Sequence, residues 1–146
     1  MKKVLLLLLL AAAPSIRIGA AADTYLKLSL PNAVASGPAF IRIADLGSQV
    51  AVTDLKTGKT TQGSKAGDRV EWQFEGHKIT AKKMPDESWI DGMFEIQQGL
   101  AMQIQVIKLN SVWACSNHQN PTHCASSEEE MRLQTAANHC EGWHKL

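Results

Sequence analysis

The sequence lacks a strong charge of either sign, because its 146 residues carry a formal net charge of +1. Near neutrality gives no electrostatic basis for nucleic-acid binding, which requires clustered lysine and arginine side chains. No Walker loop, GxGxxG, HExxH or GxSxG motif is present, so no motif indicates a nucleotide site, a zinc protease or an α/β-hydrolase. The 45% hydrophobic content argues against a disordered chain, and the length suits one domain.

Cysteines and long apolar runs are also scarce. Three cysteines are too few for a dense disulfide scaffold. The apolar run Val4–Ala13 has ten residues, whereas a helix that crosses a bilayer needs about 20. No later apolar run reaches about 18 residues, so we expect no membrane span in the mature chain.

The start of the chain has the layout of a secretory signal peptide. The basic pair Lys2–Lys3 precedes the apolar run Val4–Ala13, and the small-residue tract Gly19–Ala22 follows it. The tract contains an A-x-A pair, which predicts cleavage before Asp23. The alternative, an uncleaved anchor helix, is disfavoured because the charged Arg17 interrupts any extension of the run. Residues 1–22 are therefore predicted to be a signal peptide.

Cleavage would change both the charge and the compartment. The segment contains three basic residues and no acid, so its removal leaves 124 residues with a formal charge of −2. Export predicts a periplasmic or secreted protein, and that compartment permits disulfide bonds.

Residues 23–114 are predicted to form an antiparallel β domain. Apolar and polar residues alternate in several short segments, most clearly in Val70–Glu75 and His77–Lys82, which flank a turn at Gly76. Leu100–Leu109 is expected to be one long strand. Turn signals recur about every ten residues, and no helix-length segment lies between the strands, which favours a small antiparallel sandwich or barrel.

Residues 115–146 are predicted to form a Cys/His-rich loop followed by a helix that packs on the same domain. Ser126 or Ser127 can cap this helix through a capping box, because a glutamate lies three residues after each. The helix should run to about Asn138. The face expected to dock on the sheet contains its small and apolar residues Leu133, Ala136, Ala137 and Cys140.

A disulfide between Cys115 and Cys140 would tether this helix to the sheet. Cys115 ends a predicted strand and Cys140 lies at the end of the helix, so their bond would clamp the tail. The pairs Cys124–Cys140 and Cys115–Cys124 are the alternatives. Each pairing leaves one odd cysteine.

The same tail gathers side chains that bind zinc and copper. The candidate binding or metal residues are His118, Asn120, His123, Cys124, His139 and His144. Their spacing matches no standard zinc module, and oxidation of Cys115 and Cys140 would remove two thiolates. If the histidines bind no metal, we expect them to be solvated, to order the loop, or to make pH-sensitive contacts.

Catalytic hypotheses have less support. Cys124 with His118 or His123 as its base would require a third, orienting group, and neighbours such as His123 and Cys124 point apart on an extended loop. A glycosidase needs two carboxyl groups across a cleft, for which a 124-residue domain has little room. The candidate carboxylates are Asp86, Glu87 and Asp91 in one loop-strand region and Glu71, Glu75 and Glu95 on strands.

The sequence therefore favours an exported, non-catalytic binding protein, with a protein or an envelope component as its partner and no nucleic acid. We expect the loop from Cys115 to Ser127 to form the contact surface, through His118, Asn120 and His123. Trp89 follows a polar loop and is a further candidate interface residue. The alternative function is zinc or copper binding through the His/Cys cluster, and no other cofactor is predicted.

Overall fold

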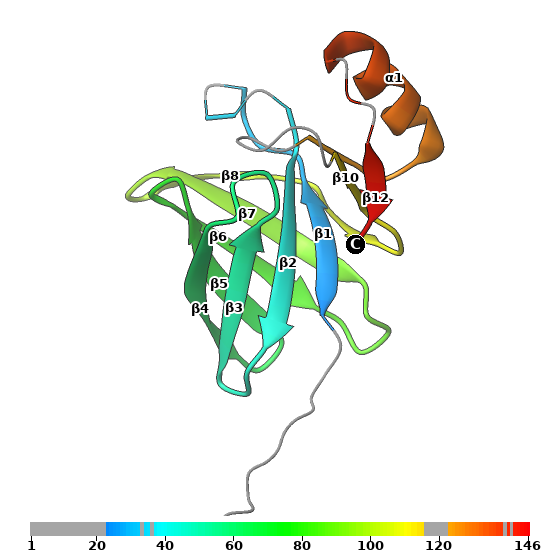
Figure 1. Ribbon diagram of the computed structural model, residues 1–146. Helices are drawn as coiled ribbons and strands as arrows, with labels where there is room; N and C mark the ends of the chain where they lie inside the picture. The colour runs from blue at the N-terminus through cyan, green and yellow to red at the C-terminus, as the bar shows by residue number, and fades with distance from the viewer. Residues whose placement is uncertain (1–22, 33, 36, 116–122, 139, 141) are drawn as a thin grey trace, which may run out of the picture.

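A computed structural model describes residues 23–32, 34–35, 37–115, 123–138, 140 and 142–146 (Figure 1). The predicted signal peptide, residues 1–22, lies outside the described residues, as do His118, Asn120 and His139.

Nine strands form one antiparallel sheet in the order β8-β7-β6-β5-β4-β3-β2-β1-β9. Their bounds are β1 Thr24–Leu28, β2 Ala39–Asp45, β3 Gln49–Asp54, β4 Thr60–Ala66, β5 Arg69–Phe74, β6 His77–Lys83, β7 Trp89–Gln97, β8 Leu100–Gln103 and β9 Val106–Leu109. The sheet curls into a half-barrel, so that β1 to β3 lie in front of β5 to β7 in the view of Figure 1.

The inner face of the curled sheet holds the main core. Strand alternation places every second residue inward, as Val70 and Trp72 of β5 and Ile79 and Ala81 of β6 illustrate. The buried residues of this core are Leu26, Leu28, Leu30, Ala39, Ile41, Ile43, Val50, Val52, Val70, Trp72, Ile79, Ala81, Trp89, Phe94 and Ile104.

The two ends of the sheet are the two halves of one extended segment. The first half, β8, pairs with β7, and the Ile104 N–H extends that ladder by donating to the Gly92 carbonyl oxygen at 2.9 Å. The second half, β9, pairs with β1, beginning where the Ser29 N–H donates to the Gln105 carbonyl oxygen at 3.1 Å. One continuous segment, β8 followed by β9, thus pairs with both β7 and β1, and this forces the sheet to curl.

The predicted mainly β fold with a disulfide-tethered C-terminal helix is confirmed. The predicted single strand Leu100–Leu109 is divided, because its pairing changes partner between Ile104 and Gln105.

A second, three-stranded sheet in the order β11-β10-β12 lies beside β1, with the helix α1 next to it (Figure 1). Its strands are β10 Trp113–Cys115, β11 Cys124–Ala125 and β12 Trp143–Lys145, and α1 is Glu128–Asn138. No helix in the part of the chain that the structure describes has the length and apolar character needed to cross a bilayer.

A smaller apolar cluster joins the main sheet to the C-terminal segment. Phe40 of β2, Val112 and Cys124 are buried together, and Tyr25, Leu55 and Leu109 pack against them. The ammonium groups of Lys27 and Lys56 lie 5.7 and 5.8 Å from the centre of the Phe40 ring, within the range of cation–π attraction.

The predicted capping box begins α1. The Glu130 N–H donates to Ser127 Oγ at 3.1 Å, and the Glu130 carboxylate accepts hydrogen bonds from the backbone N–H and hydroxyl of Ser126. Both serines therefore contribute, Ser127 as the N-cap and Ser126 through the returning carboxylate.

The prediction that Leu133, Ala136 and Ala137 dock on the sheet is wrong. Leu133 is 60% exposed and Ala136 and Ala137 are also exposed. The helix instead turns Glu130 and Thr135 inward: Lys27 Nζ lies 2.6 Å from Glu130 Oε2, and Trp143 Nε1 donates to Thr135 Oγ1 at 2.9 Å. Polar contacts to β1 and β12, rather than apolar burial, orient this helix.

Gly92 of β7 lies against Ile104 and Val106, where the contact leaves no room for a side chain. A Cβ at this position would lie 2.6 Å from Val106 Cγ2 and 2.7 Å from the Ile104 carbonyl oxygen. We predict that Gly92→Ala lowers the free energy of unfolding by about 1–3 kcal/mol, because the clash forces a backbone shift. Urea denaturation measures the loss. The control Gln103→Ala, on the exposed adjoining strand, should change stability by less than about 0.5 kcal/mol; equal effects would contradict the prediction.

Candidate functional site

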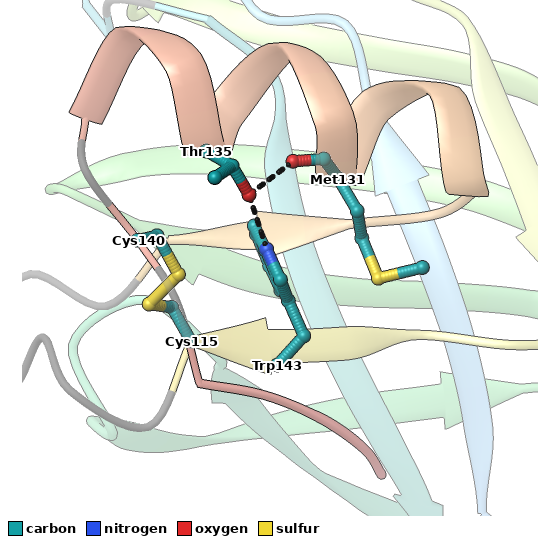
Figure 2. The surroundings of a disulfide bond; sticks show 5 residues. All are labelled: Cys115, Met131, Thr135, Cys140 and Trp143. Atoms are coloured by element: carbon teal, nitrogen blue, oxygen red, sulfur yellow. Dashed lines mark hydrogen bonds between the residues drawn. A yellow bond between two sulfur atoms is a disulfide. The ribbon is translucent and has the colours of Figure 1, made fainter.

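The disulfide joins Cys115, at the end of β10, to Cys140, with 6.1 Å between their Cα atoms and 25 residues between them in sequence. This confirms the favoured pairing and shows that both alternatives with Cys124 are wrong. Figure 2 shows Trp143 reaching from β12 to the helix beside this bond, and Thr135 Oγ1 in turn donates to the Met131 carbonyl oxygen. The bond and this hydrogen-bonded chain hold α1 to the small sheet.

Cys124, the odd cysteine, is fully buried and free. Burial raises the pKa of its thiol to about 12. At neutral pH only a fraction on the order of 10⁻⁵ of the thiol is ionised, and the thiolate is the species that attacks or binds metal. Cys124 therefore has neither the access nor the ionisation that a catalytic nucleophile requires, and its thiol is poorly prepared for exchange with the disulfide.

The structure describes two of the four predicted histidines, His123 and His144. His123 is half-buried, and its carbonyl oxygen accepts the Cys115 N–H at 2.9 Å. His144 is exposed on β12, opposite Ala114. Within the described ranges no group of three His, Cys, Asp or Glu side chains could hold a metal ion, and the oxidised Cys115 and Cys140 cannot bind one as thiolates. Because the remaining candidates lie outside those ranges, a zinc or copper site there stays a prediction.

The carboxylates of the β6–β7 loop have local structural roles. Ser88 donates to Asp86 Oδ1 through its hydroxyl at 2.6 Å and its N–H at 3.0 Å, and these bonds hold the pKa of Asp86 below its ordinary value. A general acid requires the opposite shift. Glu87 lies 3.4 Å from Lys108 Nζ, in an ion pair between this loop and β9.

Trp89 is not an exposed anchor. It is 7% exposed and belongs to the main core together with Phe94. Strict alternation would place residues five apart on opposite faces, but the register shift between Thr80 and Lys82 in the β6–β7 ladder lets both point inward. Its indole N–H and that of Trp72 are buried without a hydrogen-bond partner. Both tryptophans line openings in the wall of the half-barrel that the sequence did not reveal.

The first opening is a fork between β4 and β5. These strands pair only from Ser64↔Glu71 to Ala66↔Arg69, although β4 continues back to Thr60 and β5 continues on to Phe74. Over the unpaired stretch β4 pairs with β3 alone and β5 with β6 alone, so two strand edges face each other across the fork.

The β4–β5 fork opens on both faces of the sheet. On the inside lies a partly enclosed cavity of about 170 Å³, here called the inner hollow, lined by Ile41, Val52, Asp54, Lys59, Thr61, Gln73, Phe74, Glu75 and Gly76. On the outside lies a shallower cavity of about 330 Å³, the outer hollow, lined by Gln49, Gln62, Gly63, Ser64, Glu71, Trp72 and Gln73. The inner hollow has an apolar floor of Ile41, Val52 and Phe74, whereas polar side chains dominate the outer one.

The second opening lies where β9 leaves β7 to pair with β1. It measures about 510 Å³ and is lined by Trp89 to Gly92 and Gln103 to Val106. The Ile104–Gly92 hydrogen bond limits it at one end, and the Lys108–Glu87 ion pair links the two sides towards the other.

Comparison with known protein families, with curated proteins and with solved structures finds no match for this chain.

The disulfide should stabilise the protein far more than the free thiol does. A bond that closes a loop of 25 residues contributes about 2–4 kcal/mol, mainly by restricting the unfolded chain. We predict a loss of this size in urea denaturation of the double variant Cys115→Ala/Cys140→Ala. Cys124→Ala, which removes a buried sulfur without breaking a covalent link, is the control and should cost clearly less. A larger loss from the control would contradict the role assigned to the clamp.

The Lys27–Glu130 ion pair should make helix docking depend on pH. Burial alone would raise the pKa of Glu130, but hydrogen bonds from Lys27 and Ser126 outweigh it and lower the pKa. The stabilisation is therefore complete above the ordinary value of 4.5 and lost as the pH falls through the lowered pKa. Because both groups are partly exposed, we predict that Glu130→Gln costs at most about 1 kcal/mol at pH 7. Denaturation at pH 7 and pH 3 measures this difference, with Glu129→Gln as the exposed neighbouring control; a cost that grows towards pH 3 would contradict it.

Proposed function

We propose that this protein is an exported, non-catalytic binding protein that acts in the periplasm or after secretion. Two features support export: the signal-peptide pattern of residues 1–22, and the Cys115–Cys140 bond, of a kind that persists in oxidising compartments. The partner is a protein or another component of the cell envelope.

The observation that carries the binding role is the β4–β5 fork. Binding sites are usually concave and already formed on a rigid scaffold, and the fork is set between strands that are held on their other sides by β3 and β6. Its inner hollow combines an apolar floor with polar groups at its rim, such as Lys59 and Glu75. This combination gives both affinity and orientation to a bound group.

The chemistry of the described titratable groups supports a role without catalysis. The Cys124 thiol is buried with a raised pKa, and the pKa of the Asp86 carboxyl is lowered, so neither is prepared for nucleophilic or general-acid work.

Export has a direct test. Intact-mass measurement of the protein from the periplasmic or culture fraction should show that the first 22 residues are absent, and non-reducing peptide mapping should recover Cys115 joined to Cys140. A full-length, reduced chain in the cytoplasm would overturn the proposal. Metal analysis of the same sample tests the alternative: stoichiometric zinc or copper lost in His118→Ala/His123→Ala would favour metal binding instead.

Binding is tested by photo-cross-linking in cells. A benzoylphenylalanine at Lys59, at the rim of the inner hollow, should form a discrete adduct with a protein or envelope component. The same probe at Asp68, an exposed residue at the other end of the fork's two strands, is the matched control. Adducts of equal yield at both positions, or none at Lys59, would contradict a binding role for the fork.

A further inference from the structure

The two edges that face each other across the β4–β5 fork offer backbone hydrogen-bonding groups of a definite kind. Successive residues of a strand direct their N–H and C=O groups to alternate sides. The stretches Thr61–Gln62 and Gln73–Phe74 use one side for β3 and β6, while no strand among the described residues pairs with the side that faces the fork. A strand edge with unpaired N–H and C=O groups can form backbone hydrogen bonds with another extended chain.

The hollows on the two faces match the side-chain pattern of such a backbone. A strand between β4 and β5 would send alternate side chains inward and outward. The inward side chain meets the floor of Ile41, Val52 and Phe74, and the outward one meets the amides and hydroxyl of the outer hollow, including Gln62 and Ser64. An apolar residue flanked by polar residues satisfies both faces at once.

We propose that the β4–β5 fork binds an extended peptide segment of a partner protein by strand addition, with one apolar side chain in the inner hollow and polar neighbours outside. This inference rests on the proposed binding function and specifies its ligand class.

The size of the inner hollow favours a side chain over a free small molecule. Its volume of about 170 Å³ equals the share of roughly five to six water molecules in the liquid. Drug-sized ligands occupy pockets of about 300–1,000 Å³. One aliphatic side chain of a peptide fits the smaller space, and the backbone of that peptide supplies the remaining contacts along the strand edges.

Two features limit the segment to a few residues. At the closed end, a Cβ on Gly63 would lie only 3.1 Å from Trp72 Cβ and would also clash with the Glu71 carbonyl oxygen, so β4 and β5 touch there. At the mouth stand Lys59 and Glu75, which form no ion pair with any described residue and can attract charges that flank the bound segment.

The second opening is a poorer site for a strand. Lys108 and Glu87 join its two sides, and the backbone of Ile104 is already bonded to Gly92 at its closed end. A peptide entering from that side would meet this ion pair, and the Ile104 N–H is already bonded within the sheet.

The test uses the mature protein, residues 23–146, and the peptide acetyl-Thr-Val-Thr-Val-Thr-amide. In an NMR titration up to millimolar peptide, the amides of Thr61–Gln62 and Gln73–Phe74 should shift in a saturable manner and gain protection from hydrogen exchange. The same peptide with both valines N-methylated loses the two valine N–H donors, and its N-methyl groups obstruct the strand edge that those donors face. It should therefore bind at least tenfold more weakly. A peptide with serine in place of valine should lose a similar factor, because the inner hollow stays unfilled.

Two matched variants of β4 test where the peptide binds. Thr61→Trp fills the inner hollow and should abolish the shifts, whereas Thr60→Trp changes the exposed residue beside it, outside both hollows, and should bind as the unaltered protein does. Dispersed amide spectra of both variants establish that each is folded.

Three outcomes would overturn the inference: no shift at millimolar peptide, equal binding of the N-methylated peptide, or shifts confined to Trp89–Gly92 and β9. If a cross-link from Lys59 is still found in cells in these cases, the protein binds at the fork but its ligand is not an extended peptide. If neither the peptide nor the cross-link is found, the proposed function fails as well.

Discussion

The architecture depends on one segment that serves both ends of the main sheet. Because β8 pairs with β7 and β9 pairs with β1, the intervening strands must bend until these two partners approach each other. Gly92 allows the approach, since no side chain could fit between it and Val106. The bend encloses a core around Trp72 and Phe94. The sheet separates where β9 leaves β7 and where β5 leaves β4.

The C-terminal segment could not be stable without the main sheet. Strands of two and three residues and an eleven-residue helix are below the size that folds independently in water. Three kinds of contact compensate: the apolar cluster around Phe40, the Lys27–Glu130 pair and the Cys115–Cys140 bond. They act at different points of the segment, so the helix is held at its start by charge and at its end by a covalent link.

Local patterns predicted the features that depend on local chemistry. Alternation located β5 and β6, cysteine position identified the disulfide, and serine with glutamate located the start of the helix. The predicted helix face was wrong because apolar periodicity gives weight to Leu133. It cannot reveal that Trp143 donates a hydrogen bond to Thr135 and Lys27 donates one to Glu130. The two openings in the sheet were not predicted either, because they depend on where strand pairing stops, which local sequence patterns do not show. Nothing in the sequence of β4 indicates that its pairing with β5 stops at Ser64. Gly63 is the residue that permits the close approach of the two strands beside that point.

An unpaired strand edge is normally a hazard, because it can template aggregation, and proteins usually guard it. The edges of the β4–β5 fork are guarded by enclosure. They face each other across the fork, the fork closes at Ser64 and Glu71, and charged residues of both signs lie at its mouth. A long strand from another molecule cannot stack there indefinitely, whereas a short segment with one apolar side chain can enter. The fork thus leaves hydrogen-bonding capacity in the middle of the sheet, where access is selective, and this is the physical reason to test the proposed binding function there.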